Sequence, residues 1–157
     1  MTKPFVVLDS CVLISFLLQH DKNYEEAKHL ITHLFTEPRS FTILLSPLVL
    51  YETGIVTTRS GESENTIADR LYKLLRYDEV VIVSLSDLAV FKHLRHTARL
   101  TVREPQIKTQ DMLILNTAME FNALLVSFDK PLLKICERLG FAACATQQAL
   151  AAYTLSF

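Results

Sequence analysis

Phe5-Val6-Val7-Leu8-Asp9-Ser10, near the start of the chain, is the segment that predicts the fold most directly. Four apolar residues in an unbroken row are typical of a strand that is buried on both faces of a parallel sheet. The row ends on an acid, Asp9, and Ser10 then offers an N-cap for a mostly apolar helix at 11–18. The start of the chain therefore predicts a strand, a carboxylate and a helix in direct succession.

The same alternation continues along the chain. Further strands are predicted at 41–45, 80–85, 124–128 and 141–144, and helices at 23–35, from Ser46-Pro47, at 67–75, from Ser86-Asp87 to Arg99, from Thr109 to Phe121, from Lys130 and near the C-terminus, with a connection at 100–108. This order predicts an α/β fold, a mostly parallel central sheet flanked by helices in an α/β/α sandwich. With 157 residues, half of them hydrophobic, the chain is expected to form a single domain over residues 1–157.

Composition excludes several classes of protein. Because the chain has only three glycines, Gly54, Gly61 and Gly140, it has neither the GxGxxG turn of dinucleotide-binding proteins nor the GxxxxGK phosphate loop. Its 16 basic and 17 acidic residues leave a formal charge of -1, so any contact with nucleic acid must be local. The three cysteines lack CxxC spacing, which favours reduced thiols in a cytoplasmic protein, and neither a signal peptide nor a membrane segment is expected.

Four acids stand where a parallel sheet collects its functional groups. Asp9 and Asp129 each follow a predicted strand, Asp111 lies in the first turn of a predicted helix, and Glu52 lies among apolar residues of another helix. The loops beyond the carboxyl ends of parallel strands meet at one edge of the sheet. Each acid alone has an ordinary explanation, as a turn residue, a partner of the helix dipole or a solvent-facing side chain. Together they predict an acidic pocket.

Such a pocket predicts a divalent cation. Two carboxylates about 5 Å apart repel each other by about 3 kcal/mol at an effective dielectric constant of about 20. A cation relieves this repulsion, and oxygen ligands without nearby His or Cys favour Mg²⁺ or Mn²⁺, ions that characteristically act on phosphates. His29 and His33 stand four residues apart on a predicted helix, but no third ligand accompanies them, so a histidine metal site is not expected.

These motifs resemble the four acidic blocks of the PIN-domain ribonucleases. The blocks follow in the family's order over about residues 5 to 146: Val7-Leu8-Asp9-Ser10 with Val12-Leu13-Ile14, then Tyr51-Glu52, then Asp111 with Leu113-Ile114-Leu115 and Ala118, then Val126-Ser127-Phe128-Asp129. The resemblance implies a PIN-like fold and an endoribonuclease that depends on Mg²⁺ or Mn²⁺, most often the toxin of a VapC-type toxin–antitoxin pair. The chain departs from the family at Cys11, where Asn or Ser is usual, and is somewhat longer than many stand-alone toxins.

The resemblance also assigns roles to residues. Asp9, Asp111 and Asp129 would be the principal metal ligands, directly or through water, and Glu52 would complete the pocket or orient the attacking water. Ser127 would hydrogen-bond a ligand carboxylate. A metal-activated water would attack the scissile phosphate in line and release the 3′-oxygen, which leaves products with a 5′-phosphate. The implied partners are an RNA substrate, a small antitoxin protein and a second copy of the chain, with the apolar first two helices as candidate surfaces.

Basic residues near the acids are candidates for RNA contact. Arg103, Lys108 and Lys130 are predicted near the acidic rim, while Arg95, His96 and Arg99 form a basic face on the preceding helix. An ordinary solvated surface is the favoured explanation of the same charges.

Alternative functions separate by the residues that they require. A haloacid-dehalogenase-like phosphatase needs a second Asp where Cys11 stands, a response-regulator receiver needs adjacent acids near Asp9, and a cysteine phosphatase needs an Arg where Leu17 follows Cys11. Two alternatives stay open, namely a housekeeping RNA-processing nuclease and a PIN-fold module that binds RNA or protein without catalysis. Loss of an acid would indicate the module, and because all four acids are present, catalysis is favoured.

Overall fold

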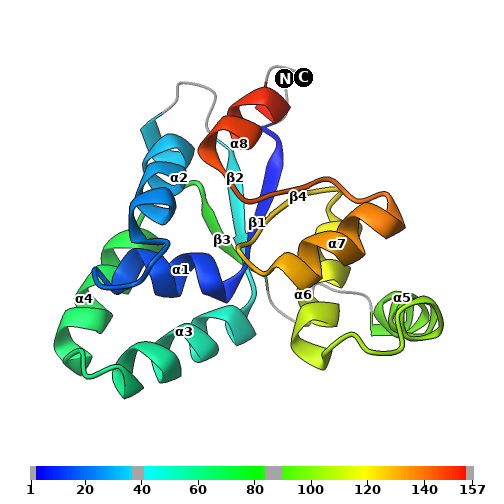
Figure 1. The fold of residues 1–157 in the computed structure, drawn as a ribbon, viewed down its shortest axis with the longest axis horizontal. Coiled ribbons are helices and arrows are strands. Elements are labelled where there is room, and N and C mark those ends of the chain that lie inside the picture. Colours follow the sequence, from blue (N-terminus) through cyan, green and yellow to red (C-terminus); the bar gives the residue numbers. More distant parts are fainter. Residues whose placement is uncertain (1–2, 37–40, 84–89, 155–157) are drawn as a thin grey trace.

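A computed structural model describes residues 3–36, 41–83 and 90–154 of the chain (Figure 1). Strands and helices alternate through these segments. The strands are β1 (Phe5–Leu8), β2 (Thr42–Leu45), β3 (Val80–Ile82), β4 (Leu124–Val126) and β5 (Ala143–Cys144), and the helices are α1 (Ser10–Leu17), α2 (Tyr24–Thr36), α3 (Pro47–Arg59), α4 (Glu64–Leu75), α5 (Val90–Arg103), α6 (Thr109–Glu120), α7 (Lys130–Leu139) and α8 (Gln147–Thr154).

The strands form one parallel sheet in the order β3-β2-β1-β4-β5. β1 lies at its centre, where Val7 pairs with Leu44 of β2 on one side and with Leu125 of β4 on the other. Helices α1 and α2 cover one face of the sheet and α6 and α7 the other, and α8 packs against α2 (Figure 1). The predicted α/β/α arrangement around a parallel sheet is confirmed.

Burial on both faces explains the unbroken apolar runs. Val6, Val7 and Leu8 of β1 are fully inaccessible to solvent, as are Leu125 and Val126 of β4. The helices that cover these strands contribute fully buried side chains from both layers, among them Leu13, Leu30, Leu34 and Leu115. Apolar side chains pack against both faces of β1. A strand with alternating polar and apolar residues at this position would therefore bury polar side chains on one face, which explains the unbroken apolar run.

Helix caps place the residues that follow the strands. Ser46 accepts a hydrogen bond from the backbone N–H of Leu48 at 3.2 Å, and Pro47 takes the first helical position, as the sequence predicts. Ser63 caps α4 in the same way through the N–H of Thr66. The start of α3 at Pro47 puts Glu52 about a turn and a half into that helix, close to the end of β2.

The end of α5 differs from the prediction. The helix continues to Arg103 instead of ending near Arg99, so the predicted connection at 100–108 is wrong over its first four residues. Leu100 is buried, and its carbonyl accepts the backbone N–H of Glu104 at 2.7 Å, which extends the helical pattern. Pro105 restricts the residue before it, and the helix stops just short of that point.

Two predicted caps and several strand ends also differ. The N-cap positions of α1 and α6 are Asp9 and Lys108 instead of Ser10 and Thr109, and neither side chain makes a capping hydrogen bond. The strands β3, β4 and β5 are shorter than predicted. β4 ends at Val126, although the N–H of Ser127 still bonds to the carbonyl of Cys144. The predicted helix start at Ser86-Asp87 and the last two residues of the predicted strand 80–85 lie outside the described residues.

Two observations bear on the environment of the chain. Cys11, Cys136 and Cys144 are free thiols, as predicted. In the segments that the structure describes, no helix combines the length and the apolar character needed to cross a bilayer.

Candidate active site

The site lies at the carboxyl edge of the sheet, between the two central strands. Asp9 follows β1 directly, and its backbone N–H bonds to the carbonyl of Val126 in β4 at 3.0 Å. The helices that follow these strands, α1 after β1 and α7 after β4, leave toward opposite faces of the sheet (Figure 1), so the strand order reverses between β1 and β4. Asp9 therefore stands at the position where parallel α/β sheets bind ligands.

Asp9 is buried and held by side-chain donors. Its side chain is 5% exposed. Ser10 Oγ donates to Asp9 Oδ1 at 3.2 Å, and Cys11 Sγ and Ser127 Oγ donate to Oδ2 at 3.0 and 2.6 Å. Hydrogen bonds to a charged acceptor are the strong ones, and together they fix the orientation of the carboxylate. Because two carboxylate oxygens offer about four lone pairs, capacity for a further ligand remains.

Glu52 reaches the same edge through Ser10. Ser10 Oγ lies 2.8 Å from Glu52 Oε2, a contact between residues 42 positions apart. A hydroxyl has one proton, so Ser10 donates to Asp9 or to Glu52 at any instant and bridges the two acids. The sequence indicated Ser10 only as a helix cap, because no local pattern shows that α3 packs against α1.

Asp129 is fixed at the start of α7. Its Oδ1 accepts the N–H of Leu132 at 3.0 Å as a helix cap, and its own N–H donates to Ser127 Oγ at 2.9 Å. Ser127 is fully buried. Its hydroxyl donates its proton to the Asp9 carboxylate and accepts the backbone N–H of Asp129. The hydroxyl links the loops that follow β1 and β4.

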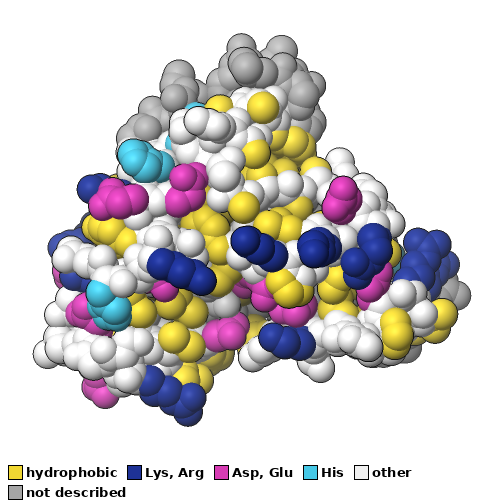
Figure 2. All heavy atoms as spheres, viewed as in Figure 1, with side chains coloured by type: hydrophobic (Ala, Val, Ile, Leu, Met, Phe, Trp, Pro, Cys, Tyr) yellow, Lys and Arg dark blue, Asp and Glu magenta, His cyan; other side chains and the backbone are white. Residues whose placement is uncertain are grey.

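Asp111 completes the acidic cluster from the first turn of α6. Burial raises the pKa of its carboxyl group, and the charges of Asp129 and Asp9, with a smaller contribution from Glu52, raise it further, against a lowering by Lys108. Acids interact in this way only when they share one region of space. The structure therefore brings Asp9, Glu52, Asp111 and Asp129 to one edge of the sheet. Figure 2 shows acidic side chains gathered near the centre of that view.

Cys11 takes a hydrogen-bonding place in this network. Burial, followed by the charge of Asp9, raises the pKa of the Cys11 thiol to about 12. The thiol thus keeps its proton, donates to Asp9 and accepts the N–H of Phe128 at 3.2 Å. Cys11 therefore acts as a positioning group, because a nucleophilic cysteine requires a lowered pKa.

The donor chemistry of the cluster fits a hard divalent cation. Its ligands would be carboxylate oxygens, which suit Mg²⁺ or Mn²⁺, and the thiol of Cys11, whose pKa is raised to about 12, remains protonated. Within residues 3–36, 41–83 and 90–154, no three His, Cys, Asp or Glu side chains form a ready-made cage for a metal. His29 and His33 on α2 likewise belong to no such group of three. The expectation of a metal therefore rests on the chemistry and mutual repulsion of the four acids.

The basic residues predicted for RNA contact occupy different places. Lys108 directly precedes α6, and its charge lowers the pKa of Asp111. Lys130 directly follows Asp129. Arg103 instead lines a separate hollow beside His96 and Arg99. The side chain of Arg95 lies outside the described part of the structure.

Comparisons with known proteins add the following findings. The family model of the PIN domain matches residues 6–138. The fold is similar to a chain in the crystal structure of VapBC2 from Rickettsia felis bound to a DNA fragment from their promoter, with a TM-score of 0.64 and 19% identity over 89% of this chain and 97% of that chain. It is also similar to Mycobacterium tuberculosis VapC20, described as a toxin that cleaves the sarcin-ricin loop, with a TM-score of 0.63 and 16% identity over 87% of this chain and 96% of that chain. No curated protein sequence matches the chain significantly.

Proposed function

The chain belongs to the PIN domain family, and from that premise we propose that it is a metal-dependent endoribonuclease, the toxin of a type II toxin–antitoxin pair. The observation that carries the proposal is the buried Asp9 carboxylate, which is held by three donors at an edge where Asp111, Asp129 and Glu52 act on one another. Like charges gathered at one point destabilise the fold, so an arrangement that keeps them together points to function.

The protein's own residues would position the reacting groups. Ser127 and Cys11 hold Asp9 in one orientation, and Ser127 also fixes the backbone at Asp129. Ser10 keeps Glu52 at the same edge, where its carboxylate could orient a water. Mg²⁺ or Mn²⁺ held by Asp9, Asp111, Asp129 and Glu52 would supply a water of lowered pKa and positive charge opposite the scissile phosphate.

The substitution Asp9→Asn tests this proposal because it removes one charge and keeps the size of the side chain. We expect metal-dependent RNA cleavage to fall about a hundredfold to a thousandfold, as for loss of a major electrostatic contact in a transition state. Cleavage is measured on gels with Mg²⁺, Mn²⁺ or a chelator, and the new ends are tested for a 5′-phosphate. The matched control is Asp69→Asn on α4, an exposed acid paired with Lys73, which should retain full activity.

A second readout separates catalysis from binding alone. If the acids hold a metal, Mn²⁺ should raise the thermal midpoint of the wild-type chain and not that of Asp9→Asn or Asp111→Asn. Full cleavage by Asp9→Asn would overturn the proposal. RNA binding without cleavage or a Mn²⁺ shift would favour a non-catalytic module.

The proposal includes partners in the cytoplasm, where free thiols persist. A hollow between α1, α2 and α4, lined by Phe16, Tyr24, Phe35 and Tyr77 among others, offers an apolar surface for a small antitoxin. On α3, Tyr51 and Ile55 are 72% and 51% exposed and stand four residues apart on one face, which suits contact with a second copy. Sedimentation of the chain, alone and co-expressed with the product of a short neighbouring gene, tests both contacts, and a monomer in both samples would contradict them.

A further inference from the structure

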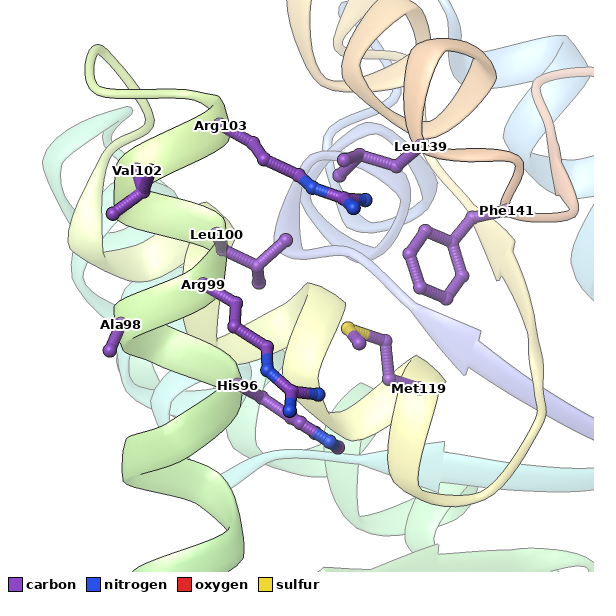
Figure 3. A pocket seen from close by; sticks show the side chains of 9 residues that line it. All are labelled: His96, Ala98, Arg99, Leu100, Val102, Arg103, Met119, Leu139 and Phe141. Atoms are coloured by element: carbon purple, nitrogen blue, oxygen red, sulfur yellow. The ribbon is translucent and has the colours of Figure 1, made fainter.

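The hollow beside His96, Arg99 and Arg103 has a volume of about 610 Å³ and lies between α5, α6 and the end of α7 (Figure 3). Leu100, Met119 and Phe141 form an apolar side, and none of the four acids lines it. Its volume falls in the usual range for small-ligand sites. The hollow is therefore a feature that the acidic cluster does not explain.

Two arginines reach over this hollow. Figure 3 shows the guanidinium groups of Arg99 and Arg103, one turn apart on α5, extending toward Met119, Leu139 and Phe141. Among the described residues, the ion pairs include neither arginine. A guanidinium group that is free of carboxylates can bind a phosphate through two hydrogen bonds or stack on a flat ring.

A line of cations connects this hollow with the acidic edge. Lys130, Lys134 and Arg138 recur every four residues along α7, about 6 Å apart, and line an adjoining hollow of about 530 Å³. Figure 2 shows a row of basic side chains over α7, beside the acidic group. The line begins next to Asp129, because Lys130 is the following residue.

The two hollows meet at one ion pair. Arg138 donates to the carboxylate of Glu104 twice, at 2.8 and 2.6 Å. Glu104 and Arg138 line the hollow beside α7, while their neighbours Arg103 and Leu139 line the hollow of Figure 3. A ligand that leaves the acidic edge along α7 would thus arrive at Arg103.

We propose that the two hollows form one binding track for the single-stranded RNA that flanks the cleaved bond. Lys130 and Lys134 bind the backbone, and further along an unstacked base enters the hollow beside Phe141 while Arg99 and Arg103 bind the adjacent phosphate. This inference rests on the proposed nuclease function. Cations that follow the backbone together with aromatic rings that stack on bases are the usual means of binding single strands.

The combination of charge and apolar surface favours RNA over the alternatives. Phosphate alone would not need the apolar side formed by Leu100, Met119 and Phe141. An acidic peptide that followed the cations of α7 would meet the like charges of the acidic edge, which would repel it. Because Lys130 and Arg138 are about 12 Å apart along the helix, the bound base lies a few nucleotides from the scissile phosphate.

Binding is measured by fluorescence anisotropy with labelled oligouridylate and oligoadenylate of about 12 nucleotides, within the usual site sizes for single strands. A chelator prevents cleavage, and salt is varied from about 50 to 200 mM. Arg99→Gln and Arg103→Gln should each weaken binding severalfold and lower the slope of log Kd against log salt by about 0.7. The matched control, Arg59→Gln in the last turn of α3, should change neither value.

The ring of Phe141 is tested separately from the charges. Phe141→Leu should weaken binding about fivefold or more without changing the salt slope, because it removes a stacking surface and no charge. Phe141 packs against the core, so Phe141→Leu is preferred to Phe141→Ala, and its thermal midpoint is compared with that of the wild type. The arginine variants decide the inference even if this variant does not fold.

Three outcomes would overturn the track. These are no binding of either oligonucleotide by the wild type, affinities of Arg99→Gln and Arg103→Gln equal to that of Arg59→Gln, or preferential binding of an acidic peptide such as polyglutamate at these arginines. Failure of the nuclease proposal looks different, since the wild type would then bind RNA with these effects and cleave none. Cleavage that depends on Asp9 and ignores Arg103 would keep the nuclease and refute the track.

Discussion

The two ends of α6 lie in opposite electrostatic surroundings. Its first turn carries Asp111 into the acidic cluster, while Met119 in its last turn lines the hollow beneath Arg99 and Arg103. Hydrogen bonds through Ser10 and Ser127 join Asp9, which is 5% exposed, to Glu52 and Asp129. By contrast, Arg99 and Arg103 are exposed and belong to none of the ion pairs among the described residues.

If the chain has the proposed function, this difference lets one helix serve two tasks. Chemistry at a phosphate requires carboxylates held in one geometry, and hydrogen-bond donors orient the buried Asp9 and the partly buried Asp129. Capture of a flexible strand requires charges that can move toward it, so exposed arginines with free rotamers serve better. Substitutions at the acidic end of α6 should therefore alter both stability and cleavage. Substitutions at the basic end should alter RNA binding alone.

The largest effect is expected for Asp111→Asn. Burial and the charges of Asp129 and Asp9 raise the pKa of Asp111 above its value of 3.8 in an unfolded chain. Stability from this group is fully present below the unfolded pKa and is lost as pH rises through the folded pKa, so at neutral pH the ionised carboxylate destabilises the fold. The variant should lose cleavage about a hundredfold or more and yet melt a few degrees higher at neutral pH without metal.

Calorimetry across a pH series in chelator checks this expectation. The gain in thermal midpoint should shrink as pH falls toward the unfolded pKa, because protonation then neutralises the wild-type carboxyl group as well. A variant that is no more stable than the wild type at neutral pH, or that differs by the same amount at every pH, would contradict the electrostatic coupling at this end of α6.

A smaller effect is expected for Ser127→Ala. The change removes a donor to Asp9 and leaves the partly buried N–H of Asp129 without its acceptor. Unfolding free energy should fall by about 1 to 3 kcal/mol, and cleavage should fall about tenfold to a hundredfold because two carboxylates lose their support. Denaturant unfolding and kcat measure the two effects.

Ser60→Ala supplies the matched control for that change. Ser60 is exposed at the end of α3 and donates to the carbonyl of Val56 at 2.9 Å. Its loss should alter the unfolding free energy by less than about 0.5 kcal/mol and leave cleavage unchanged. Equal effects of the two serine variants would refute the role assigned to Ser127.

Local patterns in the sequence were sufficient for the parts of the fold that depend on neighbours along the chain. The run at 5–8 predicts β1 to the residue, and Ser46-Pro47 predicts the start of α3. The end of α5 lies at Arg103, four residues beyond the predicted end near Arg99, because Leu100 is buried and its carbonyl accepts the N–H of Glu104. Asp9 makes no capping bond because Ser10, Cys11 and Ser127 already bond to its carboxylate.

The alternation of strands and helices and the positions of the four acids along them can be predicted from the amino-acid sequence alone. Tertiary packing brings Ser10 between Asp9 and Glu52, places Ser127 against a residue 118 positions away, and gives Arg99 and Arg103 a common hollow with Phe141. The physical reason is that hydrophobic periodicity specifies which face of each element is buried. Contacts between distant residues depend instead on the order β3-β2-β1-β4-β5, which is set by how all the buried faces pack together.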